Sequence, residues 1–301
     1  KTAYEIRPRD WSSDVCSSDL PGPLVPDRPV RYSPGMLTTT TTVEGVAVHT
    51  TGVGPALVLL HANGGDATDF AAVHDHLAAR HTVHAIDWPG WGASPADEPP
   101  TAIGYAALLP RVLRALGAGP FVLIGNSVGG FAAIRTAATN PELVRALVLV
   151  DPGGFTARWP GSVLACRAIG SRRLAPTMMR TLPRLYLRRD TAAVRSIRSH
   201  AIDQSHTPAR VDAFASIWRS FADRDHDARP DAARVAAPTL LVWGRSDPVL
   251  PLATDGRRAR RGLPDAEFVP LPCGHQAFAE MPDEFIAAID PFLDRVTTEE
   301  P

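Results

Sequence analysis

The sequence predicts an α/β fold with a mostly parallel, doubly wound sheet and a helical cap insertion. Several short runs are apolar throughout, which is typical of strands that are covered on both faces. Between these runs apolar residues recur at helical spacing, so strands and helices alternate. Such alternation favours a parallel sheet with right-handed connections. The alternation fails after Asp151 and resumes near Thr239, which predicts an insertion between two strands.

The predicted elements follow one another from about Thr41. Residues 43–49 alternate apolar and polar side chains, as a half-buried strand does. Continuously apolar strands begin at Ala56, Thr82, Phe121, Ala146 and Thr239. The predicted helices carry apolar faces formed by Phe70, Val73 and Leu77, by Leu108, Val112 and Leu116 before Gly117, and by Phe285, Ile286, Ile289 and Phe292. We therefore assign residues 41–151 and 237–297 to the core and residues 152–236 to the cap.

Residues 1–40 are expected to contribute nothing to the fold. The segments 1–5 and 10–20 read like a translated sequencing adapter, and Lys1 is the only lysine of the chain. A genuine disordered N-terminus is the alternative. Residues 21–40 are rich in proline, glycine and threonine, which predicts an extended lead-in. We treat residues 1–40 as artefactual or disordered and exclude residues 1–20 from fold reasoning.

Composition and charge indicate a globular protein with no nucleic-acid partner. Hydrophobic residues make up 45% and charged residues 21% of the chain, and a net charge of −1 gives no field that would attract a polyanion. Outside the excluded segment only Cys166 and Cys273 remain, too few for a disulfide framework. No signal sequence and no membrane-spanning run is evident. We expect a cytoplasmic monomer or homodimer without membrane contact.

The segment Gly125-Asn126-Ser127-Val128-Gly129 places a serine between a predicted strand and a predicted helix. Such a tight turn forces the serine backbone into a strained conformation, and glycines beside it let strand and helix approach closely. The Val128 N–H would lie at the helix N-terminus, where free amides and the helix dipole can stabilise an oxyanion. The segment therefore predicts a nucleophilic serine.

Three further polar segments follow predicted strands. His61-Ala62-Asn63 follows residues 56–60, Asp247 follows residues 239–243, and His275 follows residues 267–271. The order of serine, acid and histidine at strand exits resembles the α/β-hydrolase fold family, from about residue 41 to residue 292. The family usually has His-Gly at the first of these exits, whereas this chain has His61-Ala62.

This resemblance implies a catalytic triad of Ser127, His275 and Asp247. Histidine can take the serine proton and return it to a leaving group, and the aspartate would orient the imidazole. The oxyanion hole would consist of the Val128 N–H and, by resemblance, the Asn63 N–H. Asp151 also follows a strand and is the alternative acid. The Gly-x-x-Asp-Pro context of Asp247 favours Asp247. This chemistry needs no cofactor and no metal.

The predicted cap is strongly basic. It contains fifteen arginines, seven aspartates and no lysine or glutamate, so it carries +8 and the remainder of the chain −9. This charge either favours anionic substrates or simply faces solvent or another subunit. Phe214, Ile217, Trp218 and Phe221 lie at helical spacing. We predict that Trp218, Phe221 and Met178 line a substrate pocket, and that Met179 and Leu182 add to its apolar wall.

Other polar residues have weaker claims to a role in catalysis. His226 stands among Asp223, Asp225 and Asp227, which could indicate a metal site, but a solvated loop is the favoured interpretation. We give Asp87 a structural role and interpret Cys273 as a small buried residue.

The predicted function is hydrolysis of a small, largely apolar ester or related acyl substrate by a serine hydrolase. Two alternatives stay open. Gly125-Asn126-Ser127 and Cys273-Gly274-His275 are similar to motifs of carbon–carbon bond hydrolases that act on ring-cleavage products, although that family commonly has tryptophan where this chain has Gln276. The second alternative is a ligand-binding protein of the same fold that does not catalyse a reaction.

Overall fold

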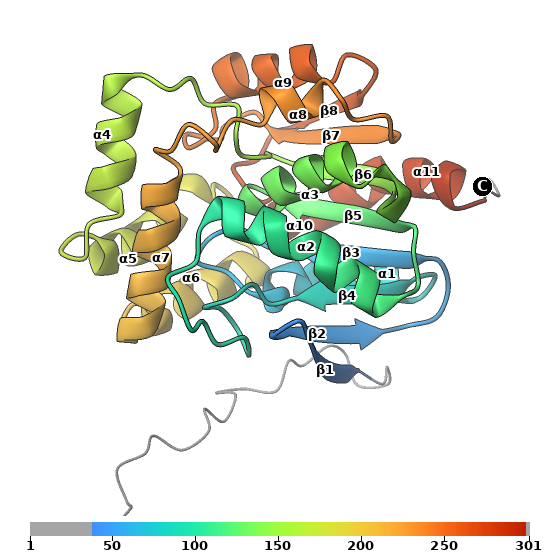
Figure 1. Ribbon diagram of the computed structural model, residues 1–301, viewed down its shortest axis with the longest axis horizontal. Coiled ribbons are helices and arrows are strands. Elements are labelled where there is room, and N and C mark those ends of the chain that lie inside the picture. The colour runs from blue at the N-terminus through green and yellow to red at the C-terminus, as the bar shows by residue number, and fades with distance from the viewer. Residues whose placement is uncertain (1–37, 299–301) are drawn as a thin grey trace, which may run out of the picture.

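The computed structural model describes residues 38–298, which form a single eight-stranded sheet with helices on both faces (Figure 1). The predicted segment 1–40 lies outside these residues except for its last three. The strands are β1 (Thr39–Val43), β2 (Val46–Thr51), β3 (Ala56–Leu60), β4 (Thr82–Ile86), β5 (Phe121–Asn126), β6 (Val144–Val150), β7 (Thr239–Gly244) and β8 (Glu267–Leu271). Their order in the sheet is β1-β2-β4-β3-β5-β6-β7-β8. All neighbouring strands from β4 to β8 are parallel, so the mostly parallel α/β sheet predicted from the sequence is confirmed.

The first two strands form a hairpin where the sequence predicts one strand. Residues 43–49 are divided by a turn at Glu44 and Gly45, which have φ of 51° and 82°. β1 pairs antiparallel with β2, and β2 pairs antiparallel with β4. The single strand predicted over residues 43–49 was wrong because alternation of polar and apolar residues continues through a tight turn and does not mark it.

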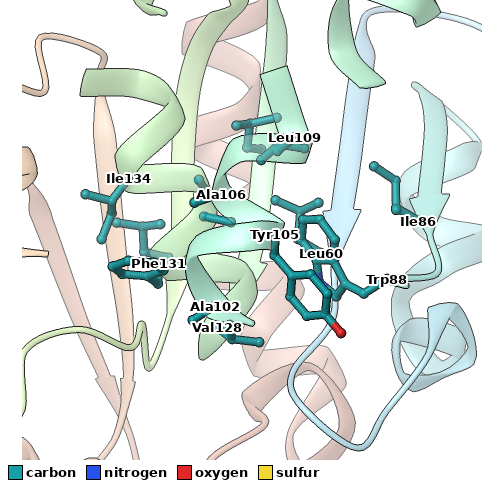
Figure 2. Packing of buried hydrophobic residues seen from close by; sticks show 14 of the residues in the cluster. Leu60, Ile86, Trp88, Ala102, Tyr105, Ala106, Leu109, Val128, Phe131 and Ile134 are labelled. Atoms are coloured by element: carbon teal, nitrogen blue, oxygen red, sulfur yellow. The ribbon is translucent and has the colours of Figure 1, made fainter. Parts of the chain in front are cut away.

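Two apolar layers account for the continuously apolar strands. Successive side chains of a strand point to opposite faces, so Val58 and Leu60 join one core cluster while Leu57 and Leu59 join the other. Figure 2 shows part of the first cluster, in which the Trp88 and Tyr105 rings stack with centroids 4.6 Å apart.

Helices α2 (Ala102–Leu116) and α3 (Val128–Thr139) pack against the first layer, and α1 (Ala71–Ala78) and α11 (Pro282–Thr298) against the second. As predicted, α2 ends before Gly117, which adopts the left-handed conformation. The remaining short elements of the core are η1 (Ala67–Phe70), η2 (Pro141–Leu143), η3 (Leu252–Gly256), α9 (Arg257–Gly262) and α10 (Ala277–Glu280).

Five helices lie between β6 and β7, inside the range predicted for the cap: α4 (Pro160–Ile169), α5 (Ala175–Tyr186), α6 (Ala192–Gln204), α7 (Pro208–Ser220) and α8 (Arg229–Ala232). Helices α4 to α7 gather at one end of the sheet, on the left in Figure 1. The short α8 instead contacts α3 and α9 of the core. The assignment of residues 152–236 as a separate cap domain stays a prediction. No helix within residues 38–298 combines the length and apolarity needed to cross a bilayer.

Close packing of α3 on β3 requires glycine at position 129. A Cβ atom at Gly129 would lie 2.3 Å from the Leu60 carbonyl oxygen and 2.9 Å from the Leu60 Cβ. Backbone atoms of a central strand cannot move aside cheaply, because interiors are close-packed.

We therefore expect Gly129→Ala to destabilise the fold by at least about 2 kcal/mol, or roughly 4–8 °C in Tm, because overpacking forces the backbone to shift. Thermal unfolding measures the effect. Gly104→Ala in α2 is the control, since its Cβ would meet only the Thr101 side-chain oxygen, at 3.1 Å. Equal Tm values for the two variants would contradict the packing argument.

A partly buried charge pair joins the helical insertion to the core. His200 Nε2 of α6 lies 2.9 Å from Asp66 Oδ2, and Asp66 caps η1 through the Thr68 N–H. Burial opposes the charge on His200, but the hydrogen bond and charge of Asp66 raise its pKa above the ordinary value of 6.5. The stabilising charge is therefore fully present below pH 6.5 and is lost as pH rises through the folded-state pKa.

We expect His200→Gln to lower the free energy of unfolding by about 1 kcal/mol near pH 6, which corresponds to a Tm lower by roughly 2–4 °C. The difference from wild type should shrink as pH rises. Unfolding is followed across a pH series, with exposed His206→Gln as the control. A pH-independent difference between His200→Gln and wild type would show that the pair carries no charge.

Candidate active site

Ser127 occupies the turn between β5 and α3 in a strained backbone conformation. Its φ of 53° and ψ of −115° lie in a region that residues with a Cβ rarely adopt. Neighbouring segments hold the turn in place. The Ser127 N–H donates to the Val150 carbonyl (3.2 Å), and the Ser127 carbonyl accepts from Gly153 N (2.8 Å). The predicted strand–turn–helix context of this serine is therefore present.

His275 and Asp247 are joined by a short hydrogen bond. His275 Nδ1 lies 2.6 Å from Asp247 Oδ2, and both side chains are almost fully buried. The other carboxylate oxygen of Asp247 accepts from the Val249 and Leu250 N–H groups at 2.8 and 3.2 Å. Burial would raise the pKa of Asp247, but the neighbouring His275 and these two amides lower it below its ordinary range. Asp247 is thus held ionised beside the imidazole.

The backbone of the His275 loop is fixed from two sides. The His275 N–H donates to the Tyr186 carbonyl at 3.0 Å, and the His275 carbonyl accepts from Asn126 Nδ2 at 3.0 Å. Asn126 directly precedes Ser127, so its amide links the serine turn to the histidine loop. Nothing in the sequence marks Tyr186 as a contact of His275, because the chain reaches it only through the inserted helices.

Asp151, the alternative acid, contacts Asp247 rather than replacing it. The polar atoms of Asp151, Asp247 and His275 lie within 4.8 Å of one another. The hydrogen bond from His275 Nδ1 nevertheless goes to Asp247, while both oxygens of Asp151 accept from the Gly244 N–H at 3.0 and 3.2 Å. The geometry therefore agrees with the choice of Asp247 over Asp151.

A cavity of about 710 Å³ opens between the sheet and the inserted helices, and both Ser127 and His275 line it. No hydrogen bond joins the Ser127 hydroxyl to the imidazole among the described side chains, although such bonds often tighten only when substrate binds. The apolar wall comes from the insertion: Met179, Leu182, Phe214, Trp218 and Phe221. Trp218 and Phe221 lie where the sequence predicts them.

Met178 is the one predicted pocket residue that does not line the cavity. It packs half-buried against the core, and its neighbour Met179 faces the cavity instead. Consecutive residues of a helix point about 100° apart, and in α5 it is the Met179 side chain that is turned toward the cavity.

Both predicted oxyanion donors lie beside the cavity. Val128 is the first residue of α3, where amides have no intrahelical acceptor, and Asn63 follows β3. The preceding His61 is structural: its Nδ1 donates to the Ala62 carbonyl (2.7 Å) and its Nε2 accepts from Trp88 N (3.0 Å). These bonds fix the loop in which this chain has alanine instead of the family's glycine.

His226 is a cavity residue that the sequence placed in a solvated loop. Its ring packs between Phe221 and Phe131, with centroids 4.7 and 4.6 Å away, and burial lowers its pKa to about 4. The solvated-loop interpretation was therefore wrong for His226. The aromatic partners come from α3 and from the end of α7, a juxtaposition that needs the fold to be seen. Within residues 38–298, His226 and the nearby aspartates do not converge as a set of metal ligands.

Arginines of the insertion also reach the cavity rim. Arg158, Arg224 and Arg229 line it together with Asp223 and Asp227, and Arg229 pairs with Asp227 at 2.6 Å. Other arginines of the insertion, such as Arg172 and Arg195, form exposed ion pairs with aspartates. The charge of the insertion is thus divided between the rim and the outer surface.

Comparisons with known proteins agree with this architecture. Residues 55–282 match the family model described as the alpha/beta hydrolase fold. The chain is 31% identical over 260 residues to a pimeloyl-[acyl-carrier protein] methyl ester esterase of Nitrosomonas europaea, covering 82% of this chain and 99% of that protein. It is 29% identical over 265 residues to a 2-hydroxy-6-oxononadienedioate/2-hydroxy-6-oxononatrienedioate hydrolase of Burkholderia vietnamiensis, covering 81% and 89%.

A solved structure shows the same fold. A thermophilic esterase from Thermogutta terrifontis superposes with a TM-score of 0.74 at 23% identity, covering 87% of this chain and 99% of that one. The family match spans most of the chain, and the relatives named above are esterases and hydrolases. The chain therefore belongs to the α/β-hydrolase fold family and is a hydrolase of that fold.

Proposed function

We propose that this protein is a serine esterase that hydrolyses small, largely apolar esters through Ser127, His275 and Asp247. The hydrogen bond of 2.6 Å between His275 and Asp247, at the wall of the cavity that Ser127 also lines, carries this proposal. The names of the relatives support a hydrolase acting on esters or carbon–carbon bonds. No cofactor is part of the proposed reaction.

In the proposed reaction the Ser127 oxygen attacks the ester carbonyl carbon while His275 Nε2 takes the hydroxyl proton. The carbonyl electron pair moves to oxygen, and the amides of Val128 and Asn63 stabilise the oxyanion. The oxyanion collapses to an acyl-enzyme, the carbon–oxygen bond to the alcohol breaks, and His275 gives its proton to the departing alcohol. Water then repeats the sequence and releases the acid. Asp247 holds the Nδ1–H tautomer and stabilises the imidazolium.

The cavity favours a substrate with a substantial apolar part. Its wall of aromatic and aliphatic side chains would bury acyl carbon atoms, at roughly 0.8 kcal/mol per methylene group. The volume of about 710 Å³ is within the range of small-molecule sites. The lining arginines Arg158, Arg224 and Arg229 are exposed. A panel of neutral and anionic esters would distinguish the two interpretations of the cap charge.

We expect a fluorophosphonate probe to label the wild-type protein and not Ser127→Ala.

His275→Ala should lower kcat/KM for a chromogenic ester about as much as Ser127→Ala, roughly 10⁴–10⁶-fold, because the members of a triad act as a unit. The control is Ser216→Ala, which removes a buried hydroxyl of α7 outside the cavity wall. If folded wild-type protein were not labelled, a ligand-binding role would be favoured over catalysis. High activity in His275→Ala would mean that the base is misassigned.

Carbon–carbon bond hydrolysis is the second candidate, because relatives such as the Burkholderia protein carry that type of name. Gln276 stands where that family commonly has tryptophan. Its side chain is buried and donates to Asp69 Oδ2 at 3.3 Å, so it is turned away from the cavity. The presence of Gln276 in place of tryptophan favours ester hydrolysis over hydrolysis of a carbon–carbon bond.

We expect turnover of chromogenic esters of varied acyl length, with no release of a dienoate chromophore from a vinylogous keto-acid under the same conditions. Ultraviolet–visible spectroscopy follows both reactions. Ser127→Ala is the blank for each substrate. Faster turnover of the keto-acid than of every ester would reverse the assignment.

A further inference from the structure

Asp151 is a buried carboxyl group that the proposed reaction leaves without a role. It lies at the end of β6, is 0% exposed, and has a φ of 41°, in the left-handed region that residues other than glycine rarely adopt. Its N–H donates to the Val242 carbonyl at 3.1 Å. Strain of this kind persists only where the surrounding structure holds it, and it tends to occur at functional sites.

Among residues 38–298 Asp151 forms no ion pair, and the charged groups that act on its carboxyl group are the acids Asp247 and Glu280. Gly244 N donates to both of its oxygens, and Asp247 and His275 lie within 4.8 Å. Glu280 of α10 and the Cys273 thiol also interact with it. Of the groups just named only the imidazole can carry a positive charge, and its Nδ1 is already hydrogen-bonded to Asp247.

Two buried carboxyl groups this close cannot both ionise at moderate cost. Their hydrogen bonds decide which one keeps the charge. Asp247 accepts from two backbone amides and from His275, whereas Asp151 accepts from a single amide. Burial, followed by the charge of Asp247, raises the pKa of Asp151 well above its ordinary value, while that of Asp247 is lowered.

We propose that Asp151 is a positioning residue that stays protonated and donates its hydroxyl hydrogen to the Asp247 carboxylate. Asp247 then receives hydrogen bonds from Val249, Leu250, Asp151 and His275, so it has one orientation. The Asp151 hydroxyl also keeps a second negative charge away from the imidazole. Its role in catalysis rests on the proposed function, but its protonation does not.

The protonation is tested by thermal unfolding of wild type and Asp151→Asn across a pH series. A carboxyl group whose folded-state pKa is raised costs stability as pH rises from its unfolded-state value through its folded-state value. The asparagine side chain does not titrate, so Asp151→Asn does not lose this stability as wild type does. The Tm of Asp151→Asn relative to wild type should therefore climb steadily with pH above about pH 4.

The matched control is Asp231→Asn, a buried aspartate that pairs with Arg135 and Arg234. Its Tm relative to wild type should show no such climb with pH, because Asp231 faces two arginines and not a second buried carboxyl group. A level difference for Asp151→Asn as well would overturn the proposal, since Asp151 would then be ionised. This measurement needs no substrate, so it stands even if the esterase assignment fails.

The positioning role is tested by kinetics. Asp151→Asn keeps a donor for Asp247 and an acceptor for the Gly244 amide, so kcat should stay within about threefold of wild type. Asp151→Ala removes both and should lower kcat by about tenfold to a hundredfold with little change in KM, the equivalent of one charge-assisted hydrogen bond. Wild-type kcat in Asp151→Ala, or equal losses in both variants, would refute the positioning role.

Discussion

The parallel alignment of β3, β5, β6, β7 and β8 is the constraint on which the rest of the structure depends. Because the carboxyl ends of parallel strands meet at one edge of a sheet, residues far apart in sequence leave the sheet side by side. Ser127, Asp151, Asp247 and His275 all lie at or just beyond such strand ends. The helices inserted between β6 and β7 then enclose this edge and supply the apolar wall of the cavity.

Buried carboxyl pairs are a recurring feature around this edge. Asp151 and Asp247 form one pair, and Asp66 and Asp69 form another at η1, the first helical element after β3. In each pair one pKa is lowered and the other raised; burial and the charge of Asp66 raise the pKa of Asp69 to about 8. The lowered member has a histidine partner in both cases, His275 or His200. In each pair the acid that holds the negative charge is the one with a histidine among its hydrogen-bond partners.

Much of the fold was predictable because each apolar run ends in a polar segment of recognisable chemistry. The sequence was enough to place Ser127, Asp247 and His275 just after the ends of strands, and to place the end of α2 at Gly117. The turn at Glu44 and Gly45 was missed, because a hairpin can preserve the alternation of a single strand.

The contacts made by the insertion were the least predictable part of the site. Helical periodicity indicated an apolar face on α7. On α5 both Met178 and Met179 were expected at the wall, and only Met179 lines the cavity. The carbonyl of Tyr186 and the ring of His226 reach the site only through the path of the inserted helices. That path is set by tertiary packing, which leaves no local pattern in one sequence.

The most direct test of the central claim is peptide mass spectrometry of the protein quenched during turnover of a slowly hydrolysed ester. The proposed mechanism predicts one acyl group per chain, on the peptide that contains Ser127, which disappears when the substrate is exhausted. Hydrolysis of the same ester with no covalent adduct, or with the acyl group on another residue, would contradict it.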